Sequence, residues 1–245
     1  MKTLFLLILS MIPLSLPPDF FEKQLKFERV AHAYASKGKD VDKLLSSKSI
    51  NTSDFDLFLR ALKQEKKLEI WGKNKHQATY KLIKIYDFCV LSGILGPKRR
   101  SGDKQVPEGV YQVTNFNPQS DYHLSFKINY PNQSDLVLSD KKNPGSDIYI
   151  HGDCVSIGCI PLGNENIEEL YLLAAKARNA SRPIHVHIFP AHLDEDSYKT
   201  LKEKYKSDKD LLVFWANLKT IYDSFEKSKI LPAVSVDLAG KYVIR

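Results

Sequence analysis

The sequence of 245 residues has no tract of like charge, no internal repeat and no low-complexity segment. Its 36 Lys and Arg alternate with 29 Asp and Glu along most of the chain, although the formal charge is +7. Without a basic tract we do not expect nucleic acid as a partner. The net positive charge suits an anionic partner such as a membrane surface or an envelope polymer. A composition of 43% hydrophobic and 27% charged residues is typical of a soluble globular protein.

The sequence also lacks a hydrophobic run long enough to span a membrane. The apolar stretch from Leu4 to Leu16 is too short for that role, and Pro13 interrupts it. The stretch follows a lysine near the start of the chain and matches the apolar part of an export signal. We therefore predict that residues 1–18 are an export signal. A retained N-terminal membrane anchor is the alternative, because Pro13 weakens the pattern for a cut after Ser15.

Cysteine is scarce, with only Cys89, Cys154 and Cys159 in the chain. In an oxidising compartment three cysteines allow one disulfide and leave one thiol. An odd cysteine in an exported protein indicates either a reactive thiol or a bond to another chain.

Apolar spacing predicts helices near both ends of the chain and strands between them. The face formed between Phe20 and Tyr34 predicts a helix that ends near Gly38, and a second helix is expected over 54–67. Alternating patterns then predict strands at 68–73, 79–93, 110–116, 122–130, 148–150 and 183–190. The remaining segments read as helices at 165–179, 194–206 and 208–226, loops at 94–109 and 131–146, and an extended end at 233–245.

These elements predict an α+β fold with a β-rich core and flanking helices at both ends. We expect a helical N-terminal region at 19–67, a β-rich domain at 68–192 and a helical C-terminal extension at 193–245 packed on that domain.

The run IYIHGDCVSIGC, residues 148–159, carries the chemistry that stands out most. His151 ends a predicted strand, and an imidazole is the usual partner that takes the proton of a nucleophilic thiol. Cys159 follows Gly158, whose missing side chain leaves room for a substrate carbonyl. The amides of Gly158 and Cys159 could then stabilise an oxyanion.

Other interpretations of these residues remain open. Zinc could be bound by a set of nitrogen and sulfur ligands drawn from His151, Cys154, Cys159, His185 and His187. The usual Cys-x2-Cys knuckle is absent, which argues against a metal site. A disulfide between Cys154 and Cys159, or an ordinary buried histidine and cysteine, would also fit the run.

Four segments in the same order identify a family resemblance. The segments VPEGVY, YHLSFKINYPN, IYIHGDCVSIGCIPL and HVHIFP resemble the YkuD-type L,D-transpeptidase catalytic domain, and in particular its YafK-like branch from Gram-negative envelopes. The resemblance covers roughly residues 55–245. The broader family places its histidine about twice as far before the cysteine and has Ser-His-Gly-Cys-Arg, where this chain has Ser156-Ile157-Gly158-Cys159-Ile160. Both departures are features of the YafK-like branch.

The resemblance implies roles for particular residues. Cys159 would be the nucleophile, His151 its general base, and the carbonyl of Gly152 would orient the imidazole. Ser156 and Gly158 would line the turn before the cysteine, and no metal or organic cofactor is implied.

The resemblance also implies weaker assignments. His123 and either His185 or His187 match family positions and could line a substrate groove, although strand histidines bonded to the backbone explain them equally well. A disulfide between Cys89 and Cys154 would leave Cys159 free, whereas oxidation of Cys154 with Cys159 would block the nucleophile.

These expectations predict an exported enzyme of a Gram-negative periplasm or envelope that forms a Cys159 thioester on diaminopimelate-containing peptidoglycan stem peptides. Transfer to an amine and hydrolysis by water both remain open, and hydrolysis could release a protein linked to the wall. A non-catalytic wall-binding or zinc-holding module is the alternative from another class.

Overall fold

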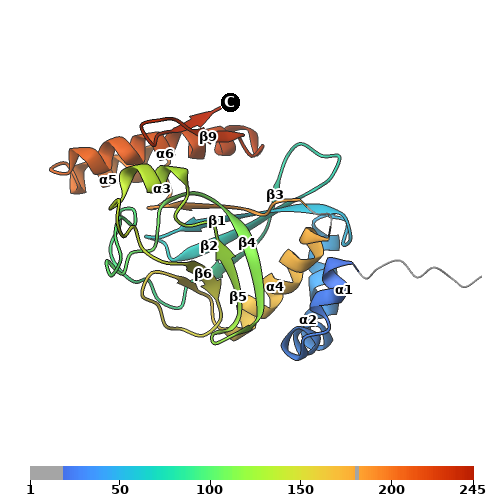
Figure 1. The fold of residues 1–245 in the computed structure, drawn as a ribbon. Helices are drawn as coiled ribbons and strands as arrows, with labels where there is room; N and C mark the ends of the chain where they lie inside the picture. The colour runs from blue at the N-terminus through green and yellow to red at the C-terminus, as the bar shows by residue number, and fades with distance from the viewer. Residues whose placement is uncertain (1–18, 180–181) are drawn as a thin grey trace, which may run out of the picture.

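The computed structural model describes residues 19–179 and 182–245, and its centre is one curled, eight-stranded sheet (Figure 1). The predicted signal, residues 1–18, lies outside the described residues. The strands follow the order β3-β2-β1-β8-β4-β5-β6-β7, and β9 and β10 form a separate hairpin. Their bounds are β1 Phe55–Leu62, β2 Lys67–Asn74, β3 Lys81–Asp87, β4 Gly109–Ser120, β5 His123–Ile128, β6 Ile148–His151, β7 Ile160–Pro161, β8 His185–Phe189, β9 Val234–Val236 and β10 Tyr242–Ile244.

Helices flank this sheet at both ends of the chain, as predicted. In Figure 1 the N-terminal helices lie beside α4, and α5 and α6 lie together with β9 on the opposite side of the molecule. The bounds are α1 Phe20–Gln24, α2 Glu28–Ser47, α3 Gln133–Leu138, α4 Asn164–Arg178, α5 Glu195–Lys204 and α6 Lys209–Ser228. The α+β class is confirmed, and so are the predicted helices at 165–179, 194–206 and 208–226.

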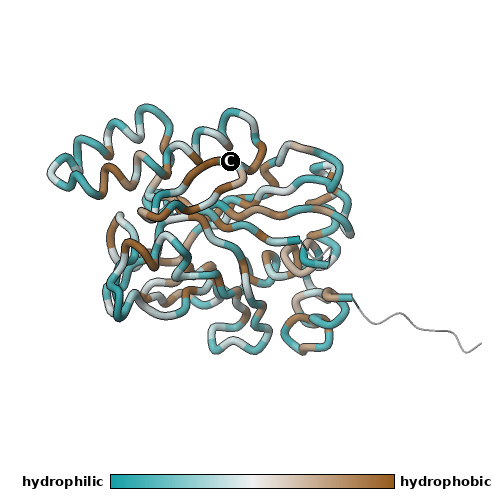
Figure 2. The backbone as a smooth tube through the Cα atoms, turned by 45° about the horizontal axis from the view of Figure 1, so that its top comes forward, coloured by the Kyte–Doolittle hydropathy of each residue, from teal (hydrophilic) through white to brown (hydrophobic). Residues whose placement is uncertain are grey.

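Strand alternation separates a core face from a polar face on β5 and β6. Phe126 pairs with Ile150, and both are buried in the main core, against which α4 packs. Successive side chains of a strand point to opposite faces, so Ser125 and its partner His151 lie on the other face. The hydrophobic pattern therefore fixes which side of this sheet carries the chemistry. Figure 2 shows hydrophobic segments along the central strands and hydrophilic outer loops.

The long strand β4 gives the sheet its curl. Its first residues, Gly109–Gln112, pair with β8, whereas the segment from Val113 onward pairs with β5 and contains register shifts. Such irregularities bend a strand and increase its local twist. The edge made by β5, β6 and β7 is consequently turned relative to β1, β2 and β3.

The predicted helix over 54–67 is wrong, because this segment contains the central strand β1. Strand β1 pairs antiparallel with β2 and parallel with β8, and Phe55 and Phe58 are both fully buried. A strand buried on both faces has a nearly continuous apolar run instead of alternation, and such a run also satisfies helical spacing. The sheet therefore begins at residue 55, inside the region predicted to be helical.

Two further boundaries differ from the prediction. Helix α2 continues past Gly38 to Ser47, with Gly38 buried beneath the Tyr34 ring within the helix and not at its end. The predicted loop 131–146 contains the short helix α3, whose start is fixed by reciprocal hydrogen bonds between Asn132 and Asp135. This capping box stabilises a helix that apolar spacing alone did not predict.

A buried ion pair fastens the long loop before β4 to the sheet. Lys63 Nζ donates to the carbonyls of Gly96 at 2.7 Å and Val106 at 2.8 Å and lies 3.0 Å from Glu108 Oε1. Glu108 also accepts hydrogen bonds from the Gly96 amide and from Trp215 Nε1 of α6. Burial lowers the pKa of Lys63, and Glu108 opposes this shift. The pair thereby joins β1, the loop and the C-terminal helix.

Replacing Lys63 with Ala is expected to lower the free energy of unfolding by about 3–5 kcal/mol, because Glu108 would remain buried without its partner. Lys67→Ala, which removes an exposed ion pair with Asp87, should cost less than about 1 kcal/mol. Urea denaturation of both variants measures the difference. Equal, small losses would show that the buried pair does not anchor the loop.

Candidate active site

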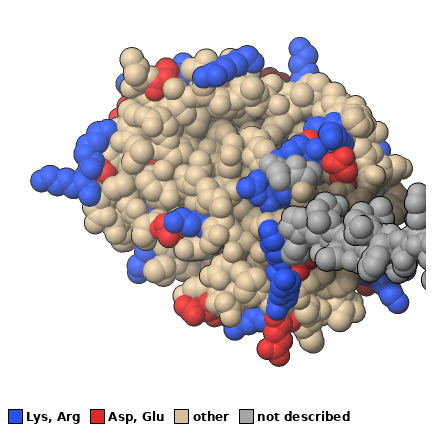
Figure 3. Space-filling view, turned by 45° about the vertical axis from the view of Figure 1, so that its right-hand side comes forward, with Lys and Arg blue, Asp and Glu red and all other residues tan. Residues whose placement is uncertain are grey.

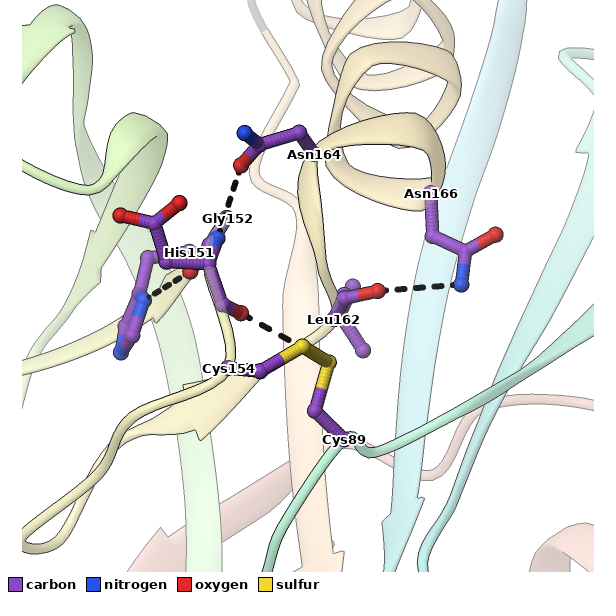
Figure 4. The surroundings of a disulfide bond; sticks show 8 residues. Cys89, His151, Gly152, Cys154, Leu162, Asn164 and Asn166 are labelled. Carbon is purple, nitrogen blue, oxygen red and sulfur yellow. Dashed lines mark hydrogen bonds between the residues drawn. A yellow bond between two sulfur atoms is a disulfide. The ribbon is translucent and has the colours of Figure 1, made fainter.

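His151 is the last residue of β6, and its imidazole is held in one orientation. Its side chain is buried, and Nδ1 lies 2.5 Å from the carbonyl oxygen of Gly152 (Figure 4). A carbonyl oxygen only accepts, so Nδ1 carries the hydrogen and Nε2 is left as the basic nitrogen. Burial lowers the pKa of His151, with the Gly152 hydrogen bond and Asp153 opposing it. The imidazole is therefore neutral at neutral pH and able to accept a proton.

Cys159 is brought to His151 by the pairing of β7 with β6. The strands run parallel, with Ile150 opposite Ile160 and His151 opposite Pro161. Continuing this register by one residue places Cys159 beside Tyr149, and the Tyr149 amide donates to Cys159 Sγ at 3.4 Å. Tyr149 and His151 are two residues apart on one strand and so share a face. The thiol and the imidazole thus lie on the same side of the sheet.

The Cys159 thiol is free, and its surroundings favour the protonated form. Burial raises the pKa of Cys159, while the Tyr149 amide and the charge of Lys98 lower it in part. At neutral pH the Cys159 thiol and the His151 imidazole are therefore both neutral.

The turn before Cys159 is fixed by Ser156. Its hydroxyl donates to the Cys159 carbonyl at 2.8 Å and accepts from the Gly158 amide at 3.1 Å. Gly158 has a φ of +141°, and a Cβ there would lie 3.0 Å from the Gln105 carbonyl oxygen, so the position favours glycine.

The two amides predicted to stabilise an oxyanion are not equivalent. Ser156 already occupies the amide of Gly158. Among the residues that the structure describes, none accepts a hydrogen bond from the amide of Cys159. The Cys159 amide is therefore the better donor for a developing negative charge.

Gly152 is required by close packing. A Cβ at this position would lie 2.6 Å from Asn164 Oδ1 and 2.8 Å from the Tyr122 carbonyl oxygen. Asn164, at the start of α4, accepts a hydrogen bond from the Asp153 amide at 2.8 Å, which holds the chain directly after His151 (Figure 4). The sequence did not single out Asn164, because its link to this loop is made only by the fold.

Cys89 and Cys154 form a disulfide, with their Cα atoms 5.1 Å apart (Figure 4). This is the predicted pairing, which accounts for the odd number of cysteines and leaves Cys159 as the free thiol. The bond ties the segment after β3 to the loop after His151. A second tie joins Ser92 Oγ to Ser156 Oγ at 3.2 Å, and the Cys89 amide donates to the Pro161 carbonyl. The segment after β3 therefore holds the loop that carries Cys159 at points before and after the cysteine.

Two of the three histidines proposed for a substrate groove, His123 and His187, lie in different surroundings. His187 is 1% exposed and packs edge-on against Phe58 in the core, and burial lowers its pKa to about 3. The prediction that His187 lines a groove is wrong, because β8 is a central strand and its side chain faces the interior. His123 lies beside Gly152, with Nε2 2.7 Å from Glu168 Oε1. A role for His123 at the site stays a prediction.

Sequence reasoning missed a buried hydroxyl next to the imidazole. Ser125 pairs with His151 across β5 and β6 and is 1% exposed. Within the described part of the chain its Oγ has no hydrogen-bond partner. A serine in an alternating strand gives no sequence signal, since only the register places it beside the histidine.

Three consecutive basic residues, Lys98, Arg99 and Arg100, lie in the loop predicted at 94–109, and two of them are held by other side chains. Lys98 is 5% exposed and bonds to Asp103 at 2.5 Å, and the Arg99 guanidinium lies over the Phe214 ring and 3.4 Å from Asp135. Only Arg100 of the three basic residues is exposed. In the described ranges, no group of three or more His, Cys, Asp and Glu side chains is arranged to hold a metal ion.

Comparisons with known proteins identify the family of this chain. The family profile of the L,D-transpeptidase catalytic domain, YkuD, matches residues 58–186. The chain therefore belongs to the L,D-transpeptidase family of the YkuD type. It is 36% identical over 191 residues to the protein named "Putative L,D-transpeptidase YafK" from Escherichia coli K12, covering 77% of this chain and 73% of that protein.

The similarity to solved structures is lower. The helical cell shape determining protein Pgp2 from Campylobacter jejuni matches with a TM-score of 0.44 and 18% identity, over 80% of each chain. Its K307A mutant matches with a TM-score of 0.45 and 22% identity, over 62% of this chain and 55% of that chain. The chain thus spans about half the length of that second structure.

The alkylation rate of Cys159 by iodoacetamide is expected to rise with pH, with a midpoint above the ordinary thiol pKa of about 8.5, because burial raises the pKa of this group. Mass spectrometry of the labelled peptide over a pH series measures it, and Cys159→Ser is the blank. A midpoint below about 7.5 would mean that the resting site holds a thiolate.

Proposed function

We propose that this protein is an exported cysteine enzyme that acts on peptidoglycan stem peptides through a Cys159 thioester. The enzyme would cleave the peptide bond between the third stem residue, a diamino acid, and the D-alanine at position four. The observation that carries the proposal is the free thiol of Cys159 on the same face as a neutral imidazole whose Nδ1 is fixed on the Gly152 carbonyl. Membership of the family supports the substrate class.

The first half of the reaction follows from this arrangement. His151 Nε2 takes the proton of Cys159, and the sulfur attacks the carbonyl carbon of the third residue. The oxyanion accepts a hydrogen bond from the Cys159 amide. When the tetrahedral intermediate collapses, the carbon–nitrogen bond breaks, and His151 returns its proton to the leaving amine. A thioester on Cys159 and a neutral imidazole remain.

The second half requires a nucleophile at the thioester. An amine would give transpeptidation and water would give hydrolysis, and in both cases His151 takes the proton of the attacking group. The exposure of the loop before Cys159 supports hydrolysis as the alternative. Ile157 is 78% exposed and Val155 is 57% exposed on the loop before Cys159, so this loop is open to water. A hydrolase of this kind would release D-alanine or a protein linked to the stem.

The proposed location is the periplasm or envelope of a Gram-negative bacterium. The apolar segment within residues 1–18 supports export. The Cys89–Cys154 disulfide is consistent with an oxidising compartment. Within residues 19–179 and 182–245, none of the helices is long and apolar enough to cross a membrane.

The distribution of charge fits a polymer with scattered carboxylates better than a continuous polyanion. On the face drawn in Figure 3, basic side chains form several separate groups with acidic ones among them. Such a surface offers local contacts for anionic groups without one extended basic tract.

Diaminopimelate-containing tetrapeptide muropeptides, incubated with the protein with and without an amine acceptor, should yield products that Cys159→Ala fails to form. We expect a loss of roughly a thousandfold or more for Cys159→Ala and for His151→Ala, because each removes one half of the acyl-transfer pair. Mass spectrometry of the products is the measurement. His76→Ala, an exposed histidine in the turn between β2 and β3, is the matched control and should behave as wild type.

The products also decide between transfer to an amine and hydrolysis. A cross-linked or amine-exchanged product would establish transfer, whereas tripeptide with free D-alanine would establish hydrolysis. Identical, unchanged spectra for wild type and Cys159→Ala would overturn the proposed substrate.

A further inference from the structure

We infer that helix α2 positions the catalytic histidine from a distance, through Arg29 and the turn that carries Tyr122. This inference rests on the proposed role of His151 as the general base. It assigns a function to the N-terminal helical region, based on the contacts of α2 with the β4–β5 turn.

The turn between β4 and β5 has a conformation that needs support. Ser120 and His123 form its closing pair, and Asp121 and Tyr122 are its two central residues. The Tyr122 amide donates to Ser120 Oγ at 3.1 Å. His123 has a φ of +69°, a region that a non-glycine residue occupies at a cost. Such a residue persists where its surroundings determine the backbone.

Arg29 of α2 supplies this support. Its Nη1 donates to the Ser120 carbonyl at 2.6 Å and to the His123 carbonyl at 2.7 Å, so one nitrogen joins both residues of the closing pair. Hydrogen bonds from a charged donor are stronger than neutral ones. The turn is thereby fixed to the helix and not only to its own strands.

A second tie holds the same turn from the side of α4. His123 Nε2 lies 2.7 Å from Glu168 Oε1, and Lys37 of α2 lies 3.7 Å from Glu168 Oε2. Lys37 also forms an ion pair with Glu165 at the start of α4. Helices α2 and α4 therefore both fix the position of the hairpin tip.

The hairpin tip reaches the catalytic imidazole through the ring of Tyr122. The Tyr122 and His151 ring centroids are 4.7 Å apart, with 37° between their planes. Tyr122 is 45% exposed, whereas His151 is 2% exposed, so the tyrosine ring lies on the solvent side of the imidazole. The Tyr122 carbonyl also packs against Gly152, the residue whose own carbonyl holds Nδ1.

This geometry makes Tyr122 a positioning residue for the base. The Tyr122 ring restricts the movement of the His151 imidazole on one side, and the hydrogen bond to the Gly152 carbonyl restricts it at Nδ1. Burial is also the main cause of the lowered pKa of His151, with the Gly152 carbonyl and Asp153 opposing it. Loss of the tyrosine ring would expose the imidazole and bring its pKa back toward the ordinary value.

The inference can be tested in a folded protein, because Arg29 and Tyr122 lie at the surface. Arg29 is exposed and lies outside the hydrophobic core, so its replacement leaves no cavity in the core. The variants are Tyr122→Ala, Tyr122→Phe and Arg29→Ala. Lys39→Ala, an exposed α2 residue outside these contacts, is the control.

Two measurements apply to each variant. Proton NMR of the His151 imidazole over a pH series, without substrate, gives its titration midpoint. The rate of Cys159 acylation by the tetrapeptide muropeptide gives the effect on reaction. Tyr122→Ala and Arg29→Ala should raise the midpoint and slow acylation roughly tenfold, since small misplacements of a reacting group have large effects on rate. Tyr122→Phe keeps the ring and should restore both values, and Lys39→Ala should match wild type.

The outcomes separate this inference from the proposed function. A wild-type midpoint in Tyr122→Ala would overturn the positioning role of the ring. A shifted midpoint in Tyr122→Ala together with a wild-type midpoint in Arg29→Ala would overturn the role of α2. If the wild-type protein fails to react with the muropeptide, the proposed substrate is wrong, while the NMR titration still tests the contact between the turn and His151.

Discussion

The short parallel pairing of β7 with β6 is the constraint on which the site depends. Parallel neighbours usually need a crossover of a dozen or more residues, whereas here the chain returns between His151 and Ile160. A connection this tight is not stable by itself, and it is held by the Ser156 hydrogen bonds, by Asn164 and by the disulfide. The contacts that stabilise the loop therefore also fix the position of Cys159 relative to the strand that carries His151.

Burial shifts the pKa values of Cys159 and His151 in opposite directions, but in both groups it favours the neutral form. It raises the pKa of Cys159 and lowers the pKa of His151, so the neutral form of each is favoured. A charged pair would form only as a substrate carbonyl arrives. Under the proposed function, this arrangement would keep the thiol in its less reactive form between turnovers and make catalysis depend on the geometry of the imidazole.

The predictive value of the sequence was highest where the relevant signal is local. The run from His151 to Cys159 contains both reacting groups and the glycines that their surroundings require, so it was recognisable as a motif. The strand β1 was mistaken for a helix because burial on both faces removes the alternation that marks a strand. The side of the sheet that His187 faces, and the contacts of Ser125 and Tyr122 with His151, depend on register and on packing between distant segments. No single segment of sequence encodes them.

The Cys89–Cys154 bond also has a topological consequence. Cys89 follows the edge strand β3, and Cys154 follows β6, which is next to the other edge strand, β7. The bond therefore closes a covalent ring that contains β4, β5 and β6. The exposed loop around Arg100 lies inside this ring. Exposed loops are where proteases cut most readily. A single cut there would leave β1, β2 and β3 covalently attached to the fragment that holds His151 and Cys159, so the nicked protein would remain one molecule.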